Sequence, residues 1–312
     1  MAKNDAIVIP YYRPDLVRIA ILIEMSSLIF LMIAVLTYIR ILRRREFCHK
    51  NLLVLLLAHP CTHITFLLLR AVRHVLFFTG YLNNTIITYI NFASDTCVST
   101  TFIIVLAYSI ERVIAMKYVH TYEQMWVKWP TLGITLYVAS LLYSLFLIIL
   151  WNARLLNNLM TYGAQYFLFT TATIFFISLR IRSGKIYRSV ADKKDSTVNE
   201  RYLSARNLKA AKLLIRLAPF KCITNYFSLA VYFWCFEMHS PFYFPLYSSI
   251  YFFASHIQLY VQMLLTIYGH TVLKEEFRSF FGGQRKSEPE EIYNVLGNKM
   301  IFNKAEQNEV DI

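Results

Sequence analysis

The stretch DTCVSTTFIIVLAYSIERVIAMKYVHTYE, residues 95–123, decides the fold class of the chain. From Thr96 to Ile110 it holds no charged residue, no glycine and no proline, so it can cross hydrocarbon as a helix that hydrogen-bonds all its own backbone groups. Glu111 and Arg112 follow directly. Because an arginine is costly at the middle of a membrane and tolerated at its edge, this pair predicts the inner end of a membrane span.

The composition of the whole chain is also that of a membrane protein. Of its 312 residues, 57% are hydrophobic and 16% are charged, and the mean hydropathy is +0.43. We therefore predict an all-α membrane protein built as a seven-transmembrane helix bundle over residues 16–268. Residues 1–15 would form an extracellular N-terminus and residues 269–312 a cytoplasmic tail. Windows of about 20 apolar residues, the length that crosses a bilayer, occur at 16–39, 51–69, 86–110, 129–150, 161–179, 213–236 and 246–268.

The net charge of +13 does not by itself indicate nucleic acid as a partner, because in a membrane protein the distribution of the basic residues reports the orientation of the spans. In a membrane protein the lysines and arginines gather on the cytoplasmic side. With the N-terminus outside, most of the 32 basic residues lie in the inner segments, while Arg70 and Arg73 fall in the first outer loop. The chain is thus expected to be a multi-pass protein of the lipid bilayer, with its N-terminus outside.

Polar side chains inside predicted spans are candidate functional residues, because ionisable groups are expensive in hydrocarbon. Asp95 can pair with a cationic ligand or with an internal base such as His63, His256 or Lys221. The internal pair is preferred, since an unpaired carboxylate in this medium would be driven to protonate. The candidate ligand pocket or buried polar network comprises Asn91, Ser94, Asp95, His63, His256 and Gln258.

Three further positions leave alternatives open. Glu24, in the first span, either faces a partner helix or reaches outward to water. His59 and His63 share a helix face, but two ligands from one helix do not complete a zinc site, so packing or hydrogen bonding is expected and no metal or other cofactor. Lys221 lies close enough to the inner end of its span to extend its amine to water, so it is not assigned to a ligand.

Two features lie at the borders of the predicted bundle. Asn83 begins the sequon Asn-Asn-Thr in the first outer loop and is a candidate for glycosylation, although closeness to the membrane can block the modification. After Tyr268, residues 271–281 predict a short amphipathic helix with three phenylalanines facing lipid, Phe277, Phe280 and Phe281.

Three separated motifs resemble one protein family. IERVIAMKYVHTYE at 110–123 is similar to the "ER-x-x-A … YE" signature of nematode chemoreceptors, most closely the serpentine receptor class epsilon (Sre) family. HKNL at 49–52 and NVLGNKMIF at 294–302 also look like that family. The chain departs from rhodopsin-like receptors because it has no acid in the second span, no cysteine in the second outer loop and no Asn-Pro before the tyrosine that ends the seventh span.

The resemblance implies a G-protein-coupled chemosensory receptor. Such a protein binds an external small-molecule ligand, activates a heterotrimeric G protein and resides in the plasma membrane of sensory neurons, in their cilia. In this chain the resemblance implies that Glu111, Arg112 and Tyr268 form the switch that couples to the G protein.

Other functions are weighed against this one. No paired carboxylates, activated nucleophile or phosphate-binding glycine loop is recognisable in the sequence, so we expect no enzyme. A ligand-gated channel or transporter of seven-span topology is the main alternative, although its pore would require more polar helix faces than the sequence displays. A structural or trafficking protein without any ligand response is the other.

Overall fold

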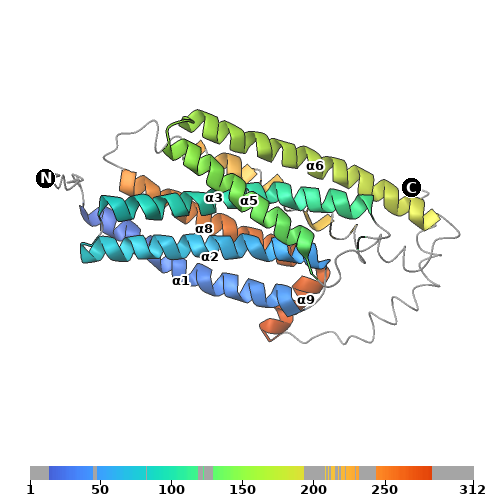
Figure 1. Ribbon diagram of the computed structural model, residues 1–312. Coiled ribbons are helices and arrows are strands. Elements are labelled where there is room, and N and C mark those ends of the chain that lie inside the picture. Colours follow the sequence, from blue (N-terminus) through green and yellow to red (C-terminus); the bar gives the residue numbers. More distant parts are fainter. Residues whose placement is uncertain are drawn as a thin grey trace.

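The computed structural model shows a bundle of long helices (Figure 1). It describes the backbone of residues 14–44, 48–81, 83–118, 122, 129–192 and 244–282, with most of their side chains, and about two thirds of the positions between 208 and 231. Every regular element in this part of the chain is a helix. The helices are α1 (Pro14–Arg44), α2 (Lys50–Thr79), α3 (Asn84–Lys117), α5 (Thr131–Asn152), α6 (Asn158–Asp192), α8 (Phe244–Gly269) and α9 (Thr271–Phe280).

Six of these helices, α1, α2, α3, α5, α6 and α8, are long and apolar enough to cross a membrane. They confirm the predicted all-α membrane bundle, but their number is six rather than seven. The remaining predicted span, 213–236, is described only in part: the positions described between 208 and 231 are helical, and residues 232–236 lie outside the described residues. The terminal segments 1–13 and 283–312, with the motif at 294–302, also lie outside the description.

Helix ends extend beyond the predicted spans because charges mark the membrane boundary without ending a helix. The third predicted span belongs to a longer helix, since α3 continues past Glu111 to Lys117 with Ala115 and Met116 buried. The membrane edge at Glu111 stays a prediction. Likewise, α2 runs on through Arg70, which the sequence placed in a loop. The short helix expected at 271–281 is confirmed as α9.

Helix α1 illustrates how the sequence separates lipid from protein contacts. Residues spaced three and four apart share a helix face. On one face the large apolar side chains are exposed, as suits contact with lipid: Ile19, Leu22, Ile23, Ile29, Phe30, Ile33 and Leu36. On the other face they are buried against the bundle: Leu28, Leu31, Val35, Tyr38 and Leu42.

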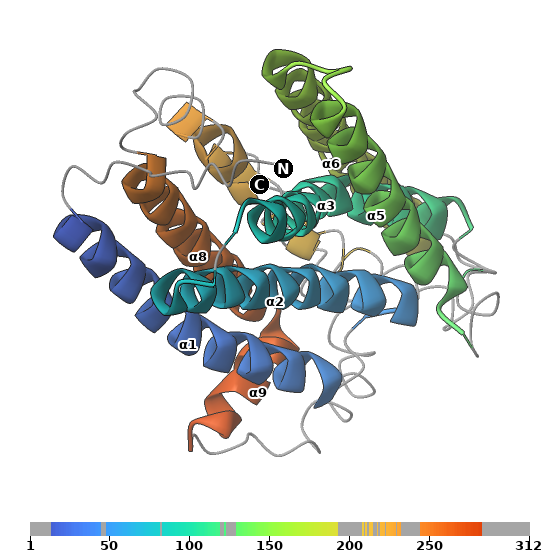
Figure 2. The same ribbon diagram turned by 60° about the vertical axis from the view of Figure 1, so that its left-hand side comes forward.

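Helix α3 lies at the centre of the bundle. It packs against α2, α5 and α6, while α1 packs against α2, α8 and α9 (Figure 2). We call the end of the bundle where α1 and α3 finish and α2 begins the Arg112 end, and the opposite end the Asn83 end. Helix α9 lies at the Arg112 end, where Arg44 of α1 makes a 3.0 Å ion pair with Glu276.

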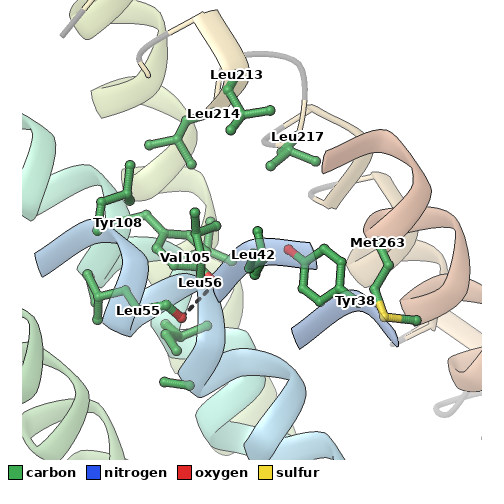
Figure 3. Packing of buried hydrophobic residues seen from close by; sticks show 14 of the residues in the cluster. Tyr38, Leu42, Leu55, Leu56, Val105, Tyr108, Leu213, Leu214, Leu217 and Met263 are labelled. Atoms are coloured by element: carbon green, nitrogen blue, oxygen red, sulfur yellow. Dashed lines mark hydrogen bonds between the residues drawn. The ribbon is translucent and has the colours of Figure 1, made fainter. Parts of the chain in front are cut away.

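An apolar core fills the space between the Arg112 end and the middle of the bundle. Figure 3 shows its side chains converging from α1, α2, α3, α8 and the 208–231 stretch, among them Leu42, Leu56, Val105, Leu213 and Met263. In this core the Tyr108 hydroxyl donates to the backbone oxygen of Leu55, 3.3 Å away. The core separates the polar groups at the Arg112 end from those deeper in the bundle.

Candidate functional site

The Glu111–Arg112 pair is buried near the Arg112 end of α3. Arg112 is 2% exposed, and its Nε and Nη2 donate to the two carboxylate oxygens of Glu111. Neighbouring positions on a helix do not face each other, so the guanidinium turns sideways along the helix surface to reach the acid. The arginine is therefore held by its own helix instead of extending out of the bundle.

Tyr122 completes this group from beyond the end of α3. It is fully buried, and its hydroxyl donates to Glu111. Burial and the neighbouring carboxylate both raise the pKa of Tyr122 above its ordinary value, so the phenol stays protonated and remains a donor. We call Asn51, Glu111, Arg112 and Tyr122 the Arg112 cluster.

Two residues of the HKNL motif hold Tyr122 in place. Asn51, fully buried at the start of α2, donates from Nδ2 to the Tyr122 hydroxyl over 3.3 Å and accepts from the Gly133 backbone N–H over 3.2 Å. The ring of His49, which caps α2, lies 4.4 Å from that of Tyr122 between centroids. Asn51 therefore joins α2, α5 and the segment after α3 at the cluster.

Gly133 is required for this junction. A Cβ built at position 133 would lie 2.4 Å from the backbone oxygen of Asn51, closer than any real Cβ contact. Because the obstructing atom belongs to the backbone, only glycine lets α5 approach α2 this closely.

The structure does not bring Tyr268 to the Arg112 cluster. Its side chain is 52% exposed, and its ring contacts Phe277 of α9. The described contacts thus join Glu111 and Arg112 as expected but leave the third predicted switch residue apart. The phenylalanines of α9 were all expected to face lipid. Phe281 is exposed, but Phe280 lies beneath the guanidinium groups of Arg40 and Arg44.

A second ion pair, toward the Asn83 end, resolves the alternatives left open for Glu24. This acid is fully buried and faces α2, where Arg70 donates to both its carboxylate oxygens over 2.9 Å. His74 Nε2 lies 3.1 Å from the same carboxylate without the alignment of a hydrogen bond. Arg70 also stacks on Phe252 of α8, 3.9 Å from the ring centroid. We call Glu24, Arg70 and His74 the Glu24 cluster.

The candidate residues of α3 lie beside this cluster. Arg73 Nη1 donates to Asn91 over 3.2 Å, and the charges acting on Asp95 come from Arg73 and Arg70. Among the described contacts Asp95 makes no hydrogen bond or ion pair, and the expected pairing with a histidine or with the lysine at position 221 is not found. The Ser94 hydroxyl is buried and also makes no hydrogen bond in the described part of the chain.

Deeper in the bundle, a small polar cavity lies between α2, α3, α8 and the 208–231 stretch. It has a volume of about 30 Å³ and is lined by His63 and Gln258 from the predicted set and by Lys221. The expectation that Lys221 reaches water is wrong, since it is 6% exposed and its Nζ lies 2.7 Å from His59 Nε2. Its partner is a histidine on α2, which was expected only to pack or hydrogen-bond.

The remaining predicted residues lie close to these two polar regions. His256 Nδ1 lies 2.8 Å from the Ser27 hydroxyl oxygen of α1, and the His256 ring lies edge-on to His63 with 6.4 Å between centroids. Among the described residues, no group of three or more metal-binding side chains is close enough to hold a metal ion. Asn83 is exposed and caps α3 by accepting from the Ile86 N–H over 2.8 Å, so its glycosylation stays a prediction.

Sequence reasoning missed the roles of Asn51, Tyr122, Arg70 and Lys221. A signal existed for the first two, because both belong to the short motifs that suggested the family. Lys221 was named as a possible internal base, but its partner His59 was not predicted. No comparable signal existed for Arg70, whose partner lies on another helix.

A search with family models finds no match to this chain, and a search of curated proteins finds none either. The resemblance drawn from the three motifs therefore supports a proposal and not a family assignment.

Proposed function

We propose that the protein is a G-protein-coupled chemosensory receptor of the plasma membrane, with its N-terminus outside. The Arg112 cluster is the observation that carries the proposal. It places a buried arginine at the more basic end of the bundle, bound to an acid of its own helix and to a tyrosine of the following segment.

The proposed mechanism is a shift between two arrangements of the helices. In the described one, Tyr122 and Arg112 both bind Glu111 and the guanidinium is buried. An external small molecule that binds the other arrangement better would favour it, release Arg112 and open a contact surface for a heterotrimeric G protein. One hydrogen bond to a charged group contributes about 1.5–3 kcal/mol, so its loss would change the balance of the two states roughly 10- to 150-fold.

The hydrogen bonds of Asn51 connect this switch to α2 and α5. Movement of α5 relative to α2 would act on Asn51 through Gly133, and Asn51 acts on Tyr122 through its side-chain amide. The position of Tyr122 therefore depends on the packing of α2 and α5.

A G-protein activation assay in cells tests the proposal. Wild type and Arg112→Ala are expressed at matched surface levels and exposed to pools of small odorants and metabolites. We expect activation in the wild type and its loss in the variant. Activation that survives in Arg112→Ala at equal surface level would contradict the proposed role of the cluster.

A channel or transporter is a second candidate, because α2 has a more polar face than expected from the sequence. Its four buried basic side chains lie at i, i+4, i+11 and i+15, on one side of the helix: His59, His63, Arg70 and His74. Ligand-evoked current or flux that persists in Arg112→Ala and without G protein would favour this candidate over the receptor.

A further inference from the structure

The small polar cavity contains buried groups that lack hydrogen-bond partners. Asn225 Oδ1 accepts from Gln258 Nε2 over 2.7 Å, which leaves the Asn225 amide group facing no acceptor among the described atoms. His63 Nε2 is likewise buried without a partner there. Asn225 is 1% exposed and His63 8% exposed, and both line the cavity. A buried polar group without a partner costs about 1–3 kcal/mol, so two in one cavity indicate that the cavity holds water or a small ligand.

The chemistry of these groups selects the charge of the ligand. The Asn225 amide nitrogen can only donate, because it carries two N–H groups and no available lone pair. The ammonium group of Lys221 has no acceptor atom, so it is the donor toward His59 Nε2. His63 can present an N–H at Nε2 in one of its two tautomers. The described lining residues include no carboxylate. The donors and the charge of Lys221 share the cavity wall with hydroxyl groups and with apolar side chains such as Phe66 and Phe102.

The size of the cavity selects a small ligand. A volume of about 30 Å³ exceeds the roughly 10–15 Å³ that one water molecule needs and is too small for a typical organic metabolite. A single monatomic anion fits both the volume and the donors. We infer that this cavity is a binding site for a small monovalent inorganic anion, with chloride as the natural occupant.

The position of the site predicts what the anion does. Lys221 and Asn225 belong to the 208–231 stretch, His63 to α2 and Gln258 to α8, so a bound anion would join three helical segments. It would stabilise their packing in the interior, where a charge has strong interactions. This inference does not depend on receptor function, since any protein with this cavity would bind the anion.

The test is the thermal unfolding of the purified full-length protein in detergent, followed while sodium chloride replaces sodium gluconate at constant ionic strength. We expect Tm to rise saturably by about 5 °C in chloride. Bromide should act like chloride, whereas the larger gluconate and sulfate should not. Equal Tm in chloride and gluconate would overturn the inference and leave the cavity as a water site.

Two variants and a control decide whether the effect comes from this site. Asn225→Asp supplies a carboxylate in place of the anion, so its Tm should be independent of chloride. Lys221→Met removes the charge and should also abolish the dependence of Tm on chloride. If this variant does not fold, Asn225→Asp alone decides the test. Lys185→Met, at an exposed position of α6, should keep the full chloride effect. A chloride effect retained in Asn225→Asp would overturn the inference.

Discussion

Glu24–Arg70 and Glu111–Arg112 are both buried acid–arginine pairs, yet they connect the protein in different ways. The first joins α1 to α2 across 46 positions of the chain, and Arg70 extends the connection to α8 through Phe252. The second joins two adjacent residues of α3. Both carboxylates are fully buried.

The difference indicates separate roles. An ion pair between helices fixes their packing, because separating the helices exposes two charges to hydrocarbon. An ion pair within one helix fixes no second helix by itself; Tyr122 and Asn51 link this pair to the segment after α3 and to α2. We therefore assign the Glu24 cluster to stability and the Arg112 cluster to switching.

The largest effect is expected from breaking the pair between helices. Arg70→Met leaves Glu24 buried without its cation and should lower the free energy of unfolding by about 3–5 kcal/mol. Denaturation of the purified protein in micelles would measure the loss. The double variant Glu24→Leu/Arg70→Met, which removes both charges, should regain most of it. A single variant as stable as the wild type would refute the structural role of this pair.

The next effect concerns the support of the Arg112 cluster. Gly133→Ala places a methyl group against the backbone oxygen of Asn51 and should lower the free energy of unfolding by about 1–3 kcal/mol. Gly163→Ala is the matched control, because a Cβ there meets nothing within 4 Å. The control should be neutral or slightly stabilising, as alanine favours a helix by up to about 1 kcal/mol over glycine. Equal stability of the two variants would refute the close approach of α5 to α2.

A smaller effect is expected from the hydroxyl that binds Glu111. Tyr122→Phe keeps the ring contact with His49 and removes the donor, so the free energy of unfolding should fall by about 1–2 kcal/mol. Tyr118→Phe is the control, since its side chain is 42% exposed. Equal losses in the two variants would show that the Tyr122 hydroxyl does not hold the cluster.

The smallest effect is expected at Asp95. Its carboxylate is partly buried and acts on Arg73 and Arg70 without a direct ion pair, so Asp95→Asn should cost no more than about 1 kcal/mol. The expected change is in stability or surface expression, measured on cells, with ligand choice unaltered. A change in ligand choice at normal surface expression would instead place Asp95 in contact with the ligand.

The sequence predicted what depends on local patterns. Apolar runs located the six membrane helices, and the adjacent acid and arginine of α3 marked the Arg112 end. It did not predict the environment of Arg70 or Lys221, because their partners Glu24 and His59 lie 46 and 162 positions away in the chain. Hydropathy counts each of these bases as an exposed charge. Only the packing of the helices shows that Arg70 is neutralised by Glu24 and that Lys221 is hydrogen-bonded to His59.

The predicted pocket is likewise divided by packing. Six polar residues were expected to form one site, but His63 and Gln258 line the inner cavity while Asn91 and Asp95 lie beside the arginines of α2. Spacing along a helix indicates which side chains share a face. It does not indicate which neighbouring helix covers each part of that face.

The most direct test of the switching role is the ligand-independent G-protein activity of Tyr122→Phe, Arg112→Ala and the double variant at matched surface levels. The account predicts that Tyr122→Phe raises basal activity, that Tyr118→Phe does not, and that Arg112→Ala abolishes the increase in the double variant. Basal activity in Tyr122→Phe equal to that of the wild type, or an increase that persists without Arg112, would contradict it.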